Sequence, residues 1–213
     1  MGLTEILLGT TSVSCYALAW RIARLRAALL TAQHDANHDA LTGLPNRRAL
    51  LAHLQALLAD HTRPVSVALL DLNRFKDIND ARGHAAGDAV LRTVASALTA
   101  LDLPATYVGR LSGDEFLMIT DGGFHQGHAN AEKASRAVAA ATVTLWGTPV
   151  ACSASIGFAT ADNNDTSAEE LLYRADAAMY YAKRIGVDVM AYFPGVERTV
   201  HLAGSGAQRR RHR

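Results

Sequence analysis

The chain has 213 residues, of which 49% are hydrophobic and 19% charged, and its formal net charge is +1. This length and composition are typical of one folded domain with a short extension and exclude a largely disordered chain. A net charge near zero gives no electrostatic reason to expect nucleic acid as a partner. The two cysteines, Cys15 and Cys152, are far apart, which argues against a disulfide framework and suits a reducing compartment.

The first twenty residues form an apolar segment that basic residues follow. Between Leu3 and Trp20 the only charged residue is Glu5, and arginines stand at positions 21, 24 and 26. A membrane-spanning helix needs about 20 apolar residues. Residues 1–20 therefore predict a transmembrane or membrane-associated helix, with the arginines keeping the rest of the chain in the cytoplasm, at the inner face of the cell membrane. Several threonines and serines interrupt the segment, so an amphipathic helix packed on a partner or on the domain is the alternative. A signal peptide is not indicated, because the basic residues follow the apolar segment.

Residues 21–38 predict a linker helix that leads directly into the domain. Leu25, Leu29 and Ala32 lie on one face at helical spacing. This face could pair with its copy in a homodimer, although the segment is short for a coiled coil.

Residues 39–194 form one predicted domain in which helices and strands alternate. In chain order the apolar patterns predict a helix at Leu50–Leu58, a buried strand at Val65–Leu70, a helix at Val90–Leu101 with its start signal at Gly87–Asp88, a hairpin of Thr106–Leu111 and Glu115–Thr120, a helix at Ala129–Trp146, a strand at Val150–Ala159, a helix at Leu171–Ala182 and a closing strand at Val187–Phe193. This order predicts an α+β fold, a split βαβ sheet with helices on one face. Residues 195–213 form a basic tail without apolar periodicity, which we expect to be disordered.

Three acidic residues stand where the predicted strands end. Asp71 follows the buried strand, and Asp114 and Glu115 lie at the tip of the hairpin. If the hairpin pairs beside that strand, the three carboxylates converge, and like charges so close repel one another unless a cation lies between them. Carboxylate oxygens suit Mg²⁺. Taken alone, Asp71 is equally typical of a helix N-cap.

The segment Arg110-Leu-Ser-Gly-Asp-Glu-Phe116 closely resembles the GGDEF signature of diguanylate cyclases, with Ser112 in place of the first glycine. Further blocks of the chain resemble that family in the same order: Asp39-Ala-Leu-Thr-Gly-Leu-Pro-Asn-Arg-Arg48, Asp71-Leu-Asn-Arg-Phe-Lys-Asp-Ile-Asn-Asp80, Gly83-His84 with Gly87-Asp88, Ser155-Ile-Gly157 and Ala175-Asp-Ala-Ala-Met-Tyr-Tyr-Ala-Lys183. The resemblance covers Asp39 to Phe193. It implies a palm-type nucleotidyl cyclase sheet with surrounding helices, preceded by the N-terminal helix.

The resemblance also implies roles for individual residues. The catalytic set would be Asp71, Asp114, Glu115 and Lys183. The metal, Mg²⁺ or Mn²⁺, would be held by Asp71, Asp114 and the backbone carbonyl of Leu72. The substrate GTP would contact Phe75, Lys76, Asn79, Asp88, Ser112 and Gly113. In this set the amides of Phe75 and Lys76 would hold phosphates, Lys76 and Lys183 would neutralise phosphate charge, and Asn79 and Asp88 would read guanine. Any one of these residues alone could instead be a cap or a solvated surface charge.

The activity that the resemblance implies is the condensation of two GTP into the second messenger cyclic di-GMP and pyrophosphate. The 3′-hydroxyl of one GTP would attack the α-phosphate of another. Since each site of this family holds one GTP, the reaction implies a homodimer. The alternative is a catalytically weak domain of the same family that binds GTP and acts as a regulatory module.

The chain departs from the family pattern at three places. Ser112 replaces a glycine, and Val187 stands where the family has an arginine that would contact phosphate. Leu103 and Thr106 occupy the positions of the arginine and aspartate of the family's product-inhibition site. We therefore expect no strong product inhibition through that site.

Overall fold

The computed structural model describes residues 3–161 and 166–195, and the side chains from residue 19 onward within those ranges. The chain divides into two compact units, Met1–His38 and Asp39–Arg213. The first unit is the single helix α1 (Leu3–Asn37), which includes both the predicted apolar segment and the linker helix without a break. Within the described ranges, no helix combines the length and the apolar character that crossing a membrane requires. The predicted membrane segment gains no support from this finding, and the side chains of residues 1–18 lie outside the described part.

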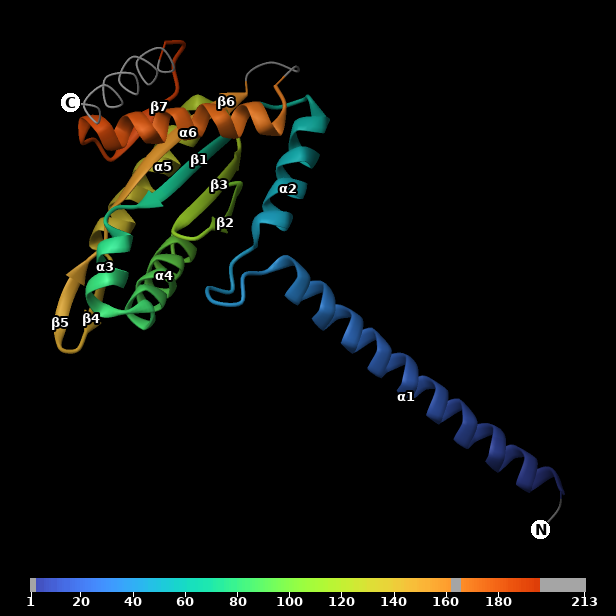
Figure 1. Cartoon of the computed structure of the whole chain (residues 1–213). Coiled ribbons are helices and arrows are strands. Elements are labelled where there is room, and N and C mark those ends of the chain that lie inside the picture. The colour runs from blue at the N-terminus through green and yellow to red at the C-terminus, as the bar shows by residue number, and fades with distance from the viewer. Residues whose placement is uncertain (1–2, 162–165, 196–213) are drawn as a thin grey trace, which may run out of the picture. The chain divides into compact units, whose positions relative to one another are not determined.

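The second unit is built on a five-stranded sheet with the strand order β2-β3-β1-β6-β7 (Figure 1). Its strands are β1 (Val65–Leu72), β2 (Thr106–Ser112), β3 (Glu115–Asp121), β6 (Ala154–Ala161) and β7 (Val189–Ala191). The central strand β1 runs antiparallel to β3 and β6, while β7 runs parallel to β6. This arrangement confirms the expected split βαβ sheet.

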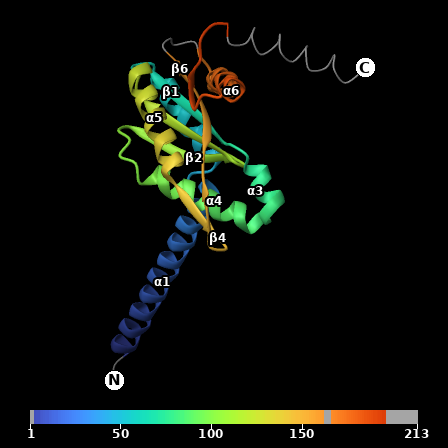
Figure 2. The same cartoon turned by 90° about the vertical axis from the view of Figure 1, so that its left-hand side faces the viewer.

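Helices pack on both faces of this sheet, so the expectation of helices on one face is wrong. The helices are α2 (Arg47–Asp60), α3 (Phe75–Arg82), α4 (His84–Thr99), α5 (Phe124–Ala140) and α6 (Ala168–Ile185). Val65, Val67 and Leu69 point into the core shared with α2 and α6, whereas Leu70 and Leu72 point into the core shared with α4 and α5. Figure 2 shows the strands between α5 and α6. A central strand covered on both sides is mostly apolar, and in β1 every residue from Val65 to Leu70 is buried, with Ser66 as the one polar residue among them.

A small hairpin replaces the end of a predicted helix. The helix expected at Ala129–Trp146 is α5, which ends at Ala140, and the strands β4 (Thr142–Leu145) and β5 (Thr148–Ala151) follow. The β-branched run Thr142–Thr144 favours a strand. Gly147, at φ +80°, supplies the left-handed turn that a two-residue hairpin needs. The strand predicted at Val150–Ala159 is accordingly divided between β5 and β6. The predicted tail lies outside the described residues from position 196 onward.

Candidate active site

The C-terminal end of β1 is where the predicted acidic residues meet. Asp71 is the cross-strand partner of Glu115 on β3 and of Ser155 on β6. Asp114 lies in the turn between β2 and β3, and its backbone carbonyl accepts a hydrogen bond from the amide of Leu72 at 3.3 Å. The expectation that the hairpin pairs directly beside the buried strand is therefore confirmed.

Two of the three carboxylates are already engaged by other side chains. The Lys183 ammonium nitrogen, on α6, lies 2.6 Å from Oδ1 of Asp71. The hydroxyl of Ser112 donates a hydrogen bond to the carboxylate of Glu115. Across residues 3–161 and 166–195, no three His, Cys, Asp or Glu side chains are arranged as a formed metal site. A cation at this edge of the sheet would compete with Lys183 for the Asp71 carboxylate.

The electrostatics of this edge nevertheless suit a cation. Partial burial and the nearby charge of Asp71 raise the pKa of Asp114, and Glu115 adds to the effect. A carboxyl whose ionisation is opposed by its neighbours is stabilised as the anion when a cation approaches. The available donors, carboxylate and backbone carbonyl oxygens, are the ligands that Mg²⁺ prefers. The donor chemistry thus fits the predicted metal, whose ligand set stays a prediction.

Sequence reasoning missed a fourth acid at this edge. Partial burial and the charge of Glu115 raise the pKa of Asp176, which lies on α6. Asp176 and Lys183 are separated by seven residues, which is two turns of a helix and places them on the same side of α6. That spacing was the signal in the sequence that could have identified Asp176.

Arg110, in β2, ties the hairpin turn to the start of the domain. Its guanidinium donates to the Gly113 carbonyl from Nε at 3.0 Å and from Nη2 at 2.7 Å. Nη1 of the same group donates to both carboxylate oxygens of Asp39, at 3.0 and 3.1 Å. Burial opposes ionisation of Asp39, but hydrogen bonds from Thr42 and Arg110 prevail and lower its pKa. The turn that carries Asp114 is thus held by a partly buried ion pair, a contact that the sequence analysis did not predict.

The predicted guanine-reading residues lie where α3 and α4 meet. Oδ1 of Asn79 is buried and accepts no hydrogen bond from the described residues. A Cβ on Gly87 would lie 2.1 Å from that oxygen and 3.0 Å from the Phe75 ring, so only glycine permits this approach. Gly87 lies inside α4, because this helix begins at His84. The helix start that the sequence indicated at Gly87 is thus three residues too late. Asp88 follows it and is half-buried. An unpaired buried acceptor is costly and is typical of a ligand site.

A cavity of about 430 Å³ lies next to Asp71, at the N-terminal end of α3. Its lining includes Leu72, Arg74, Lys183 and Val187. Amide groups at a helix N-terminus and a lysine are suited to phosphate. Lys76 is exposed and does not line this cavity, whereas Arg74, to which the sequence analysis gave no role, does. Val187 faces the same space, so its replacement of an arginine removes a cation from the lining.

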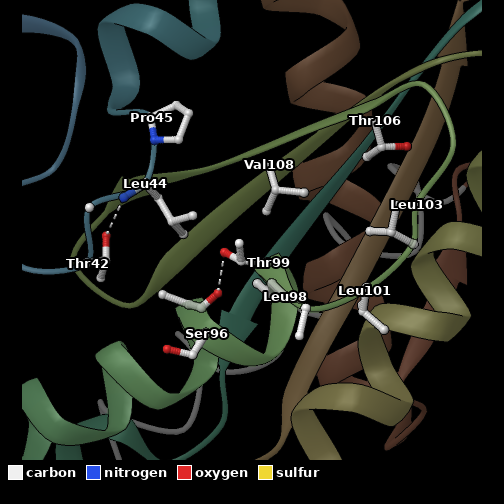
Figure 3. Close-up of a pocket in the computed structure, with 13 residues that line it drawn as sticks. Thr42, Leu44, Pro45, Ser96, Leu98, Thr99, Leu101, Leu103, Thr106 and Val108 are labelled. Carbon is white, nitrogen blue, oxygen red and sulfur yellow. Dashed lines mark hydrogen bonds between the residues drawn. The ribbon is translucent and has the colours of Figure 1, made fainter. Parts of the chain in front are cut away.

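Leu103 and Thr106 lie in a separate cavity of about 730 Å³ between α4, β2 and the segment 42–45 (Figure 3). None of its lining residues carries a charge. The hydroxyl of Thr106 also receives a hydrogen bond from Asn130 at 2.8 Å. Leu103 and Thr106 thus lie in a neutral lining, and the expected lack of strong product inhibition through this region stays a prediction.

Comparisons with known proteins agree on one family. Residues 36–188 match the family model described as diguanylate cyclase, GGDEF domain. The chain is 36% identical to diguanylate cyclase TpbB of Pseudomonas aeruginosa over 78% of this chain and 39% of the relative, and 36% identical to diguanylate cyclase DgcP of the same species over 70% and 23%. It therefore spans well under half of these curated relatives.

Solved structures give the same result. The coiled coil and GGDEF domain of DgcB from Caulobacter crescentus, in complex with c-di-GMP, superposes with a TM-score of 0.78 at 30% identity, covering 85% of this chain and 99% of that one. The GGDEF domain of TpbB from Pseudomonas aeruginosa gives a TM-score of 0.68 at 34% identity, covering 77% and 99%. The fold is therefore the palm-like nucleotidyl cyclase fold of these domains. With a family match over more than half of its length, the chain belongs to the GGDEF-domain family of diguanylate cyclases.

Proposed function

We propose that this chain is an active diguanylate cyclase, which condenses two GTP into cyclic di-GMP and two pyrophosphates. The observation that carries the proposal is the cross-strand pairing of Asp71 with Glu115, with Asp114 in the adjoining turn and Lys183 against Asp71. Relatives named as diguanylate cyclases support it.

The proposed metal is Mg²⁺ or Mn²⁺, held by the carboxylates of Asp71 and Asp114 and by the backbone carbonyl of Leu72. When bound, such a cation supplies a lowered pKa at the attacking hydroxyl and charge stabilisation at phosphate oxygens. Glu115 would accept the proton of the 3′-hydroxyl, which is general base catalysis. Lys183 would release Asp71 and bind the phosphates of a GTP held in the neighbouring cavity.

Recognition of the base is assigned to Asn79 and Asp88. Oδ1 of Asn79 is the buried acceptor without a donor, and the amino group of guanine supplies one. The Asp88 carboxylate would accept from the guanine N1–H and amino group, donors that adenine does not present in that arrangement.

In each of the two condensation steps a 3′-oxygen forms a bond to an α-phosphorus, the bond to pyrophosphate breaks, and the hydroxyl proton leaves through Glu115.

The reaction requires two domains that face each other, since one site holds one GTP. We assign dimerisation to residues 21–38, because Leu25 and Leu29 on α1 are 69% and 58% exposed. Attachment of the chain to a membrane through residues 1–20 rests on the sequence pattern alone and is part of the same proposal.

A catalytically weak GTP-binding module is the second candidate. The observation that favours it is Val187, which lines the phosphate cavity without the positive charge expected there. Ser112 acts in the same direction, because its hydroxyl engages Glu115.

The test is a product assay with the purified full chain, GTP and Mg²⁺. The proposal predicts cyclic di-GMP together with two pyrophosphates for each product molecule. Saturable GTP binding without any product would instead establish the regulatory module.

A further inference from the structure

A cavity of about 450 Å³ on the α2 and α6 side of the sheet shares Glu115 with the site described above. Its lining also includes Arg47 from α2, and Glu169, Leu172, Tyr173 and Asp176 from α6. Cavities of this size are typical of small-molecule sites. Because Glu115 lines the cavity, a ligand in it would lie beside the proposed reaction centre.

Opposite charges line this cavity without pairing. Among the residues that the structure describes, no ion pair joins Arg47, Glu169 or Asp176 to any other side chain, although salt bridges occur elsewhere in the domain. Arg47 also lies in the first turn of α2, where the helix dipole disfavours a cation. Arg47, Glu169 and Asp176 are exposed, so water satisfies their charges in the free chain, and all three stay available to a ligand in the cavity.

The lining suits a neutral, planar group with separate donor and acceptor edges. An anion would be repelled by the carboxylates, and a cation by Arg47. Guanine places two acceptors, O6 and N7, on one edge, where a guanidinium binds them in bidentate geometry. Its N1–H and amino group form a donor edge, which the carboxylates of Glu169 or Asp176 can accept. The half-exposed ring of Tyr173 and the Leu172 side chain offer surfaces for stacking the base.

We infer that this cavity is an accessory guanine site, which takes the base of a guanine nucleotide other than the one assigned to Asn79 and Asp88. The inference rests on the proposed function only in its choice of guanine nucleotides as the ligands present at this edge. The base could belong to the substrate held by a partner copy or to the cyclic product, which carries two guanines.

The test measures equilibrium binding of guanosine to the full chain without divalent metal, so that neither phosphates nor turnover are needed. All variants carry Asp88→Ala, which removes the proposed contact to the substrate base. If the accessory site exists, the chain with Asp88→Ala alone still binds guanosine. It should bind adenosine at least about tenfold more weakly, since each bidentate base contact discriminates by about that factor or more. Adding Arg47→Ala should weaken guanosine binding by at least about tenfold for the same reason.

Matched variants separate recognition from general damage. Arg48→Ala removes a neighbouring exposed arginine outside the cavity lining and should leave guanosine binding unchanged. Tyr173→Phe keeps the stacking ring and should retain binding, whereas Tyr173→Ala should lose it. The inference is overturned if Asp88→Ala abolishes guanosine binding, if Arg47→Ala and Tyr173→Ala bind as well as their controls, or if adenosine binds equally well.

Steady-state kinetics of a chain that carries Arg47→Ala but keeps Asp88 then identify which nucleotide places its base in the cavity. If the product occupies the cavity, Arg47→Ala raises the cyclic di-GMP concentration needed for half-inhibition. If a partner's substrate occupies it, Arg47→Ala raises KM for GTP. A chain that binds guanosine as described but makes no product would contradict the proposed cyclase activity and leave the accessory site standing.

Discussion

At the residue scale, the ion pair between Lys183 and Asp71 both positions the lysine and neutralises the aspartate. The pair is 2.6 Å long, with side chains 36% and 17% exposed, so solvent weakens its contribution to stability. Its importance is positional: it holds the lysine in the lining of the cavity proposed to take phosphates, and it neutralises an acid that would otherwise repel Asp114. In the proposed reaction both partners would turn to new ligands when GTP and metal bind.

Val187→Arg should improve the enzyme, because Val187 lines the phosphate cavity and an arginine there can form a charge-assisted hydrogen bond. Such a bond contributes about 1.5–3 kcal/mol, less where solvent reaches it. The expected result is a rise in kcat/KM for GTP, measured by steady-state kinetics. Ile185→Arg adds the same charge at an exposed position outside the lining and serves as the control. Equal effects of both variants would show that general charge, and not this contact, matters.

The hairpin turn is the element on which the site depends most. Asp114 lies in it, Glu115 begins β3, and Arg110 connects its Gly113 carbonyl to Asp39. The ion pair therefore supports the turn in addition to its two strands and the bond from the Leu72 amide to the Asp114 carbonyl.

Asp39→Asn should destabilise the domain by about 1–3 kcal/mol at neutral pH, the usual effect of losing a charged hydrogen-bond partner. The pKa of Asp39 is lowered in the folded state, so its stabilising effect is present above the ordinary carboxyl pKa and is lost as the pH falls through the folded value. Urea unfolding should therefore show the wild type and the variant converging in strongly acidic solution. Asp77→Asn breaks an exposed pair with Arg74 and should have a much smaller effect at any pH.

Gly157→Ala tests the packing of α6 on the sheet. A Cβ at Gly157 would lie 2.1 Å from the Ala175 carbonyl and from the Met179 amide, both backbone atoms of α6. We expect a loss of about 3 kcal/mol or more in unfolding free energy, because neither atom can move without shifting the helix. Gly122→Ala is the control, since its Cβ would meet only side-chain atoms, the nearest of them 3.1 Å away on Gln126. Comparable stability of the two variants would contradict this account of the glycine.

At the scale of the whole molecule, the cyclase reaction needs two copies. Replacing both Leu25 and Leu29 by Asn should shift the chain toward monomer in sedimentation equilibrium and lower its specific activity, because these exposed leucines lose the apolar surface that association would bury. Gln33→Glu changes an exposed residue on the same helix and should leave both quantities unchanged. A double variant that remains dimeric would place the dimer contact elsewhere.

Local sequence patterns were enough to predict the elements that form from residues adjacent in the sequence. The apolar run before Asp71 and the turn residues Ser112–Gly113 predicted the strand and the hairpin, and hence the meeting of Asp71 with Glu115. Contacts between residues distant in sequence were not predictable in this way. The bond from Arg110 to Asp39 and the placement of α6 against the sheet depend on how separate elements pack, so the spacing of Asp176 and Lys183 could not by itself bring Asp176 near Glu115.

The most direct test of the account is cyclic di-GMP formation by the full chain and by Asp114→Asn, at saturating Mg²⁺ and GTP. The wild type should release two pyrophosphates for each cyclic di-GMP. Asp114→Asn should form none, because it removes one anionic ligand from the proposed metal site, while Asp60→Asn, an exposed change at the end of α2, should be fully active. Undiminished product formation by Asp114→Asn would contradict the central claim that this edge of the sheet is the catalytic centre.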